Sequence, residues 1–369
     1  MHPMRTLVAG LALGSLAVVG CTDSDDSADG STGTTAGGTP TSASGGSAPG
    51  DTLASVRAAG VVKCGTREDL PGFATLDAAG EHVGFDADFC RVIAAAVLGD
   101  AAKVQFVSVA TADRFTALQS GEIDVLVRNT TWTASRDGTE GARFLHPTFY
   151  DGQGMMVAAD GGFDSLEDLA GGVVCAAGGT TSEGNVATEF ERLGLEPPEV
   201  LSFDSADLVQ QAFQADRCDG WSSDRSQLIG LRSKYPDGPE SLVILEDAFS
   251  KEPLAPAVRD GDADWAQAVE WAVLATIQAE EFGLTSDNVD AQATSSTDPN
   301  VKRFLGVAVD GAVLDPGLGL PPDFAHQVVS QVGNYGEIYE TNVGGPLDLD
   351  RGLNALWTDG GLQYAPPFR

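Results

Sequence analysis

The sequence predicts an α/β protein of two Rossmann-like lobes joined by a two-segment hinge, with a helical extension at the C-terminus. Apolar, strand-like runs alternate with amphipathic helices from residue 51 onward, and the same alternation starts again after residue 153. Two segments, near 150–157 and 242–256, would carry the chain from one lobe to the other and back. Such a double crossing is typical of lobes that close on a ligand by a hinge motion.

The chain is expected to divide into five parts. Residues 51–369 are long enough for two domains of ordinary size. The expected parts are a signal peptide (1–20), a lipidated cysteine with a flexible linker (21–50), the first part of lobe 1 (51–153), lobe 2 (154–246), and the return to lobe 1 with the helical extension (247–369).

The first lobe is predicted from short apolar strands and amphipathic helices. The segment 86–98 places Phe89, Val92 and Ile93 on one face, as a helix packed on a sheet does. Glu122–Val127 alternates apolar and polar side chains like a strand. The expected strands are 61–64, 104–107 and 123–127, and the expected helices are 86–98 and 112–119.

The second lobe repeats this alternation. Ser165, followed three residues later by Asp168, has the form of a capping box at a helix start. The expected strands are 154–159, 173–177, 220–224 and 242–245, and the expected helices end at Leu193, cover 207–215, and cover 265–281 on the return.

The N-terminus has the pattern of an export signal. Arg5 is followed by a small and apolar run, Leu7–Val19, which is too short to span a bilayer as a mature helix. Cys21 follows directly, and the junction resembles the lipobox of bacterial lipoproteins, whose cysteine carries a lipid. The alternative is an ordinary secretory signal with an incidental cysteine. Residues 22–50 contain only Gly, Ser, Thr, Asp, Ala and Pro, which predicts a flexible tether.

The charge excludes some partners. The formal net charge is −33, and because residues 1–50 hold one arginine and four aspartates, residues 51–369 carry −30. A body this acidic is a poor partner for nucleic acid or anionic lipid. An anionic ligand would therefore need a locally positive site.

Cysteine usage fits an exported protein. Apart from Cys21, four cysteines remain, which is an even number and allows three pairings. We favour the pairs Cys64–Cys90 and Cys175–Cys218, because each then lies within one expected lobe. The four histidines are scattered and no CxxC occurs, so we expect neither a metal nor another cofactor.

One stretch points to a binding site. After the strand 123–127 comes Arg128–Arg136, a run of hydroxyls and amides that ends in an arginine. An arginine fork binds a carboxylate through two parallel hydrogen bonds, and hydroxyls donate or accept as needed. No nucleophile stands beside a base here. The stretch predicts a site that holds a small carboxylate.

Eight segments stand out together, in this order along the chain: 70–73, 84–91, 114–122, 128–133, 150–154, 250–254, 331–338 and 352–357. Taken together they resemble the solute-binding proteins of ABC amino-acid importers, and most closely their general L-amino-acid-binding branch. The resemblance implies a protein with the type II periplasmic-binding-protein fold, which captures L-amino acids outside the cell membrane and delivers them to ABC permease subunits. We expect a monomer that is anchored through Cys21.

The resemblance also implies roles for individual residues. Arg136 pairs with the ligand α-carboxylate, which Thr131 also contacts. Thr180 and Thr181, at a helix start in the second lobe, meet the same carboxylate, because free amides and the helix dipole favour an anion there. Asp224 accepts the α-ammonium. The expected ligand-binding residues are Arg136, Thr131, Asp224, Thr181, Thr180, Phe73, which packs on the ligand, and Asn129.

Each role has a structural alternative. Arg136 could pair with Asp137 or Glu140, the threonines and Asp224 could only cap helices, and Phe73 could belong to the core. In the charged loop after the first strand, Arg67 or Glu68 could contact a ligand side chain or face solvent.

Two other functions compete with import. A dehydratase-like enzyme on the same scaffold would need a general acid or base in the cleft, such as Glu68 or Glu183. The sequence contains no GxSxG, HExxH or P-loop motif, and we expect no enzyme. A sensor subunit would bind the same ligand without transport.

Overall fold

A computed structural model describes residues 50–369. The expected signal peptide, Cys21 and nearly all of the linker lie outside the described residues. Within the part that is described, no helix is both long and apolar enough to cross a membrane.

The first lobe is built on a mixed five-stranded sheet, in the order β5-β1-β6-β14-β7. Strands β5, β1 and β6 are parallel, whereas β14, from the returning chain, runs antiparallel to both of its neighbours. The expected strand at 123–127 is reduced to two residues. The strands are β1 Val62–Thr66, β5 Val104–Ser108, β6 Val125–Leu126, β7 Ala142–Phe144 and β14 Ala257–Arg259.

Helices cover this sheet. Helix α2 contributes eleven buried residues to the core of the lobe. The long helix α8 packs beside it. A small sheet of three antiparallel strands precedes α2. These elements are α1 Thr52–Ala59, β2 Asp69–Leu70, β3 Ala74–Leu76, β4 His82–Val83, α2 Phe85–Leu98, α3 Arg114–Ser120, α4 Ala134–Thr139 and α8 Ala263–Glu281.

The second lobe has its own sheet, in the order β10-β9-β11-β8-β12, with β13 also paired to β8. The capping box of Ser165 and Asp168 is confirmed at the start of η1. The elements are η1 Leu166–Leu169, β9 Val173–Ala177, α5 Thr181–Leu193, β10 Glu199–Phe203, α6 Ala206–Gln214, β11 Gly220–Asp224, α7 Arg225–Ser233, η2 Pro239–Ser241 and β12 Leu242–Ile244.

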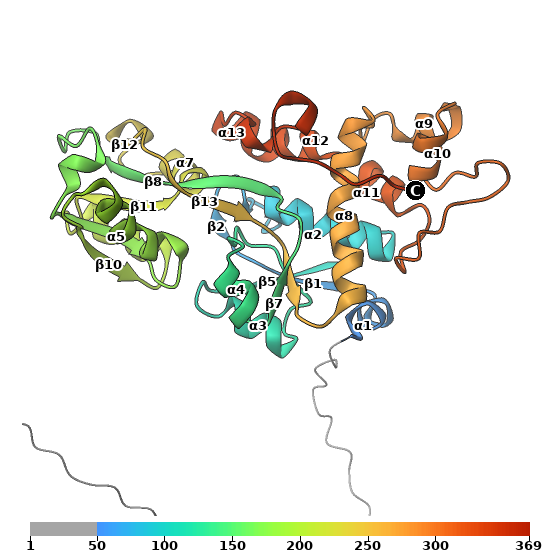
Figure 1. Ribbon diagram of the computed structural model, residues 1–369, viewed down its shortest axis with the longest axis horizontal. Coiled ribbons are helices and arrows are strands. Elements are labelled where there is room, and N and C mark those ends of the chain that lie inside the picture. Colours follow the sequence, from blue (N-terminus) through green and yellow to red (C-terminus); the bar gives the residue numbers. More distant parts are fainter. Residues whose placement is uncertain (1–49) are drawn as a thin grey trace, which may run out of the picture. The chain divides into compact units, whose positions relative to one another are not determined.

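Two antiparallel strands connect the lobes (Figure 1). Strand β8 (Phe149–Ala158) leaves the first lobe and β13 (Phe249–Leu254) returns to it. At the first-lobe end, Leu254 bridges to Thr131. The pairing therefore ties both connecting segments to the stretch that the sequence singles out as a binding site.

The C-terminal region packs helices onto α2 and α8. The guanidinium of Arg351 lies over the rings of Tyr335 and Tyr339, at 5.0 and 5.1 Å, and pairs with Glu280 at 3.0 Å. The helices are α9 Val289–Ser295, α10 Pro299–Phe304, α11 Phe324–Gln331, α12 Tyr335–Tyr339, the π-helix Glu340–Gly344, α13 Gly345–Leu347, and the 3₁₀ turns Gly352–Asn354 and Trp357–Asp359.

Both favoured disulfides are present. Cys64–Cys90 joins β1 to α2, and Cys175–Cys218 joins β9 to the loop between α6 and β11, with Cα–Cα distances of 6.0 and 5.7 Å. Each bond lies within one lobe and restricts the unfolded chain, which stabilises the fold.

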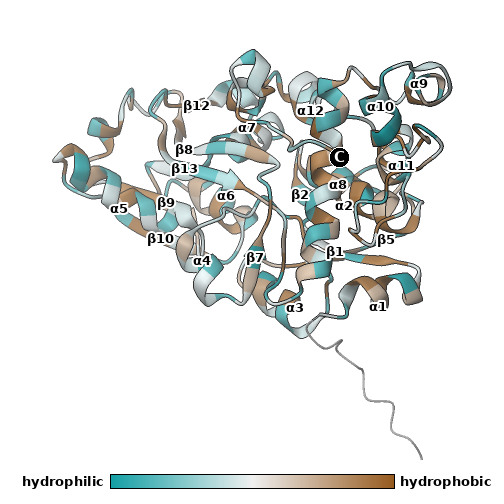
Figure 2. Cartoon of the chain, turned by 45° about the vertical axis from the view of Figure 1, so that its right-hand side comes forward, coloured by the Kyte–Doolittle hydropathy of each residue, from teal (hydrophilic) through white to brown (hydrophobic). Residues whose placement is uncertain are grey.

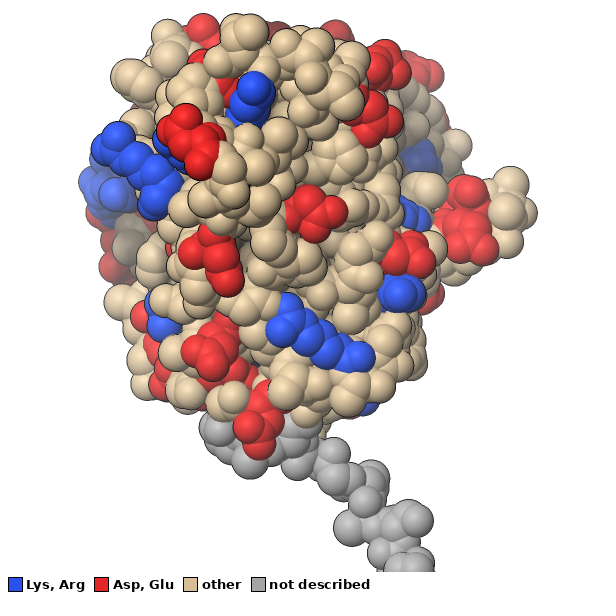
Figure 3. All heavy atoms as spheres, turned by 90° about the vertical axis from the view of Figure 1, so that its right-hand side faces the viewer, with Lys and Arg blue, Asp and Glu red and all other residues tan. Residues whose placement is uncertain are grey.

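The charged residues of the chain are mostly acidic, with 54 Asp and Glu against 21 Lys and Arg. Figure 2 shows hydrophobic and hydrophilic residues alternating along the helices, as expected for elements with one buried face. On the face in Figure 3, acidic side chains are spread over the surface among fewer basic ones, without forming one large patch. This face has the form of a solvated acidic surface rather than of a binding site for a polyanion.

The turn before α2 generates a first prediction. Gly84 has φ 126°, and a Cβ there would lie 2.3 Å from the carbonyl oxygen of Phe73. Gly84→Ala should therefore lower the free energy of unfolding by more than about 3 kcal/mol, through strain and a backbone clash. Gly80→Ala is the matched control, because Gly80 has φ 83° and open space around it, and should cost only about 1 kcal/mol. Equal midpoints in urea unfolding would contradict this.

Candidate functional site

A cavity lies between the two sheets and is lined from both lobes. The first lobe contributes mainly cationic and amide side chains, and the second contributes hydroxyls and one acid. The lining residues are Arg67, Thr111, Arg114, Arg128, Asn129, Thr131 and Arg136 from the first lobe, and Ala177, Thr180, Thr181, Ser182, Ala206, Ser223, Asp224 and Gln227 from the second.

The topology explains why these residues meet. Arg67 follows β1, Arg128 follows β6, Thr180 follows β9, and Asp224 ends β11. Each of these strands has a parallel neighbour. In the first lobe β1 pairs with β5 and β6, and in the second lobe β9 pairs with β10 and β11. In open α/β sheets, ligands bind outside the carboxyl ends of the strands. The cavity lies at these ends in both lobes.

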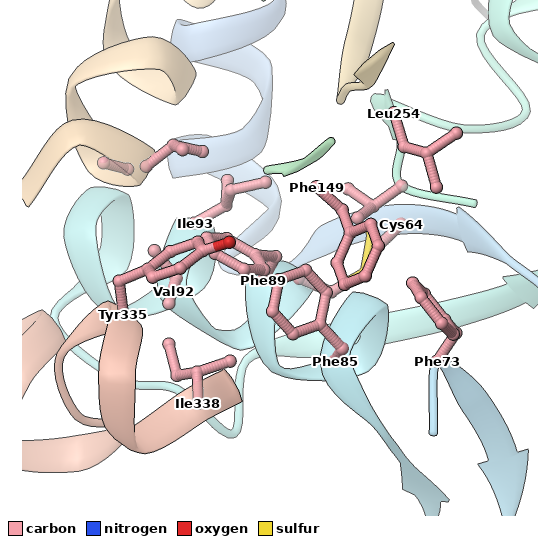
Figure 4. Packing of buried hydrophobic residues seen from close by; sticks show 14 of the residues in the cluster. Cys64, Phe73, Phe85, Phe89, Val92, Ile93, Phe149, Leu254, Tyr335 and Ile338 are labelled. Atoms are coloured by element: carbon pink, nitrogen blue, oxygen red, sulfur yellow. A yellow bond between two sulfur atoms is a disulfide. The ribbon is translucent and has the colours of Figure 1, made fainter. Parts of the chain in front are cut away.

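Six of the seven predicted ligand-binding residues line the cavity: Arg136, Thr131, Asn129, Thr180, Thr181 and Asp224. Phe73 does not. It is fully buried, with its ring 5.9 Å from that of Phe85 and 5.2 Å from that of Phe149 (Figure 4). This aromatic cluster holds Phe73 in the core of the first lobe, so its side chain packs there instead of lining the cavity.

Arg136 is held by backbone carbonyls. Its Nη1 donates to the carbonyl of Thr131 at 2.9 Å and its Nη2 to the carbonyl of Gly179, across the cavity, at 3.4 Å. Burial lowers the pKa of Arg136, while Glu252 and Asp224 raise it. Neither of the alternative partners, Asp137 or Glu140, forms an ion pair with it among the described ion pairs. The guanidinium is therefore oriented by carbonyls and lies in the field of Glu252 and Asp224 without pairing directly with either.

The second-lobe wall opposite Arg136 is the start of α5. Thr180 caps the helix by accepting from the amide of Glu183 at 3.2 Å. Thr181 donates to Glu252 at 2.8 Å, and its hydroxyl lies 3.4 Å from that of Thr131 in the other lobe. A helix N-terminus and paired hydroxyls thus face the arginine, which is an arrangement suited to an anion.

The negative side of the cavity is formed by Asp224, with two more acids behind it. Burial raises the pKa of Asp224 well above its usual value, and the nearby Asp151 and Glu252 raise it further, whereas Arg136 lowers it. The pKa of Asp151 is likewise raised, to about 6, mainly by burial. A cation bound at Asp224 would favour the ionised form of these acids.

Several lining residues were not predicted from the sequence. Arg67 is buried rather than facing solvent: it pairs with Asp69 at 2.5 Å and donates to Asn129 and to Gln227 of the other lobe, each at 3.2 Å. Glu68, by contrast, pairs with His82 at 3.3 Å. Gln227 could have been found by its spacing of three residues from Asp224 at the start of α7. Arg67 lies in the charged loop for which the sequence left both a ligand contact and exposure to solvent open.

Asn129 links the two lobes by a hydrogen bond and has an unusual backbone conformation. Its φ is 28°, and its side-chain amide donates to Gln227 at 3.0 Å. Its own backbone amide donates to the buried carboxyl of Asp86 at 2.8 Å. Strained residues of this kind persist where the surrounding contacts hold them, often at ligand sites.

Metal ligands are not gathered in residues 50–369: no group of three or more His, Cys, Asp or Glu side chains there could hold a metal ion.

Comparison with known proteins identifies the family. The sequence profile of the bacterial extracellular solute-binding proteins, family 3, matches residues 62–287. The chain belongs to this family. Together with the two mixed sheets, this membership confirms the predicted type II periplasmic-binding-protein fold.

Relatives of this solute-binding protein cover nearly its whole described length. The general L-amino acid-binding periplasmic protein AapJ of Rhizobium johnstonii is 48% identical over 320 residues, which are 86% of this chain and 93% of that protein. The glutamate/glutamine/aspartate/asparagine-binding protein BztA of Rhodobacter capsulatus is 44% identical over 326 residues, covering 88% and 95%. A periplasmic binding protein from Brucella ovis, solved with glutathione bound, superimposes with a TM-score of 0.82 at 43% identity, covering 86% and 99%.

The buried carboxyl behind Asn129 generates a second prediction. Burial raises the pKa of Asp86 from 3.8 to about 7, opposed by the Asn129 amide and by Arg67 and Arg128. Between pH 4 and 7 the folded protein therefore holds a proton that the unfolded chain releases, so stability falls as pH rises, by at most roughly 4 kcal/mol. Asp86→Asn should lose less stability than the wild type across this interval.

Urea unfolding at pH 4.5 and 7.5 measures the difference. Asp113→Asn, at an exposed position, is the control and should follow the wild type. Parallel pH slopes for Asp86→Asn and wild type would show that the Asp86 carboxyl ionises normally.

Proposed function

We propose that this protein captures L-amino acids outside the cell membrane, in the cavity between its lobes, and delivers them to the permease subunits of an ABC importer. The observation that carries the proposal is the placement of opposite charges in one cavity: Arg136 with the α5 N-terminus at one side, and Asp224 at another. An α-amino acid is a zwitterion with the same two poles. The names of AapJ and BztA, which bind amino acids, support this ligand class.

The roles follow from the contacts. Arg136 binds the α-carboxylate, helped by the hydroxyls of Thr131 and Thr181 from the two lobes, and Asp224 accepts the α-ammonium. Because these groups come from different lobes, a bound ligand joins the lobes through charge-assisted hydrogen bonds. Thr180, as the helix cap, orients the amides of the α5 N-terminus, and Asn129 positions Gln227 at the lobe boundary. The protein would bind one ligand as a monomer.

An enzyme is less well supported by the same geometry. Glu68 and Glu183, the acids that a dehydratase-like reaction would use, are not among the residues lining this cavity. Glu183 instead accepts from the amide of Gly179 at 2.9 Å. A role as a sensor subunit would use the same ligand contacts.

Binding and its dependence on Arg136 form the third prediction. Titration calorimetry of the purified protein against the twenty L-amino acids and glutathione should show binding of amino acids with one site per chain. Arg136→Ala should weaken it by at least about tenfold, because a buried charge partner is lost. Arg192→Ala is the control, since Arg192 is exposed on α5 and pairs with Glu189. Absence of binding to every amino acid would reject the proposed function.

Membrane attachment forms the fourth prediction. We propose that Cys21 carries the lipid and that the linker after it tethers the lobes at the outer face of the membrane. Cys21→Ser should move the protein from the membrane fraction to the soluble fraction and abolish labelling by a radioactive fatty acid. If the wild type itself is soluble and unlabelled, the ordinary secretory signal is the correct interpretation.

A further inference from the structure

A second cavity lies in the second lobe, at the edge of its sheet opposite the cavity between the lobes. Asp224, which ends β11, lines the cavity between the lobes, whereas Asp219, which directly precedes β11, lines the second one. This outer cavity has a volume of about 340 Å³, and the two cavities share no lining residue. Its volume is within the range found for small-molecule sites.

The walls of the outer cavity carry four carboxylates and no cationic side chain. Asp160, Asp216, Asp219 and Asp237 line it, and none of them belongs to an ion pair among residues 50–369. Asp219 accepts a hydrogen bond from the backbone amide of Val173 at 2.8 Å. The other three are exposed, so their charges are available to a ligand.

Basic residues that neighbour these positions in the sequence make other contacts. The guanidinium of Arg217 lies over the ring of Phe203, 5.4 Å from its centroid. The ammonium of Lys234 donates to the carbonyl of Asp69 in the first lobe at 2.6 Å. Neither lines the outer cavity, so neither neutralises the carboxylates at its walls.

Two helices end at the outer cavity. Helix α6 ends at Gln214, which lines the cavity, and Asp216 follows it. Helix α7 ends at Ser233, and Tyr235 and Asp237 follow it. The C-terminal end of a helix carries partial negative charge and favours a cation nearby. Both helix ends therefore add to the attraction that the carboxylates exert on a cation.

Tyr235 provides an independent sign of a ligand. The residue is only 8% exposed, yet its hydroxyl forms no hydrogen bond within residues 50–369. Burial raises the pKa of Tyr235, and the charges of Asp237 and Asp216 raise it further, which places the hydroxyl near both carboxylates. A buried polar group without a protein partner normally finds one in a ligand or in water.

Aromatic rings form another part of the wall. Phe163 and Phe213 line the outer cavity together with Tyr235. A cation held over an aromatic face is attracted by the ring quadrupole, and the methylene groups of an organic cation also pack on such rings. A bare metal ion would not use these surfaces. Moreover, residues 50–369 contain no group of three or more His, Cys, Asp or Glu side chains that could hold a metal ion.

We propose that the outer cavity binds a small organic cation with two or more ammonium groups, such as a diamine or polyamine. Carboxylates spread around the wall can each meet one ammonium group of a flexible chain, and the Tyr235 hydroxyl accepts a further hydrogen bond. The segments between the ammonium groups then contact the aromatic rings. Because the two cavities share no residue, absence of amino-acid binding would reject the proposed function without bearing on this inference.

The first test is titration calorimetry of the purified protein with spermidine at pH 7 and low salt. We expect one site per chain, and magnesium chloride at equal charge concentration should displace spermidine only in part, since Mg²⁺ makes no contact with the rings. Absence of spermidine binding overturns the inference. Binding of several molecules per chain with equal affinity also overturns it, because that would be a general attraction to an acidic chain.

The second test locates the site by substitution. The double variant Asp216→Asn with Asp237→Asn should weaken spermidine binding by at least about tenfold, since each exposed charge pair contributes up to about 1 kcal/mol. Asparagine also tolerates the positive φ of 52° at position 216, so the backbone can be retained. Glu191→Gln, an exposed acid on α5 outside the outer cavity, is the control and should bind like the wild type.

Tyr235→Phe measures the part played by the hydroxyl. It should weaken spermidine binding about threefold, because one hydrogen bond is lost while the ring remains. Equal affinities of the wild type and the double aspartate variant, or an equal loss in Glu191→Gln, would contradict the proposed site. The double variant decides the inference even if Tyr235→Phe does not fold.

Discussion

The burial of guanidinium groups between the lobes is the constraint on which the site depends. The protein is strongly acidic, yet the cavity walls carry Arg114, Arg128 and Arg136, none of which forms an ion pair within residues 50–369. Carbonyls of Val109, Thr131 and Gly179 orient these groups, and the field of nearby carboxylates such as Asp86 and Asp224 offsets part of the cost of burying them. Under the proposed function, a bound carboxylate pairs with a cation that the fold has already oriented.

Polar contacts cross between the lobes beside the cavity. Gln227 meets Arg67 and Asn129, and Thr181 lies against Thr131. The first lobe, in contrast, is consolidated by the C-terminal helices, through Tyr335 and the pair of Arg351 with Glu280. A ligand that contacts groups of both lobes adds to these polar contacts and so favours the closed arrangement.

Opposite poles are separated across the cavity instead of being paired with each other. Asp224 has Asp151 and Glu252 behind it, and burial keeps the pKa values of Asp224 and Asp151 high. If Asp224 and the arginines were in direct contact, they would neutralise each other and no zwitterion would be needed. Asp224 ends a strand of the second lobe, whereas Arg136 lies on α4 of the first lobe, so the two poles are carried by different lobes.

The sequence alone determined the local helices and strands and pointed to the first-lobe part of the cavity. The alternation of apolar runs located β9 and β11 to the residue, and the even number of cysteines together with the lobe boundaries led to both disulfides. The sequence also singled out the run from Asn129 to Arg136, three residues of which line the cavity. These features could be predicted because periodicity and short-range chemistry act within a few residues. Tertiary structure decided the rest. Phe73 lies in the core because the rings of Phe85 and Phe149, from other elements, pack against its ring. Arg67 and Arg114 line the cavity because the order of the strands places them beside the other lobe. The balance of charge in a cavity depends on residues that only folding brings together.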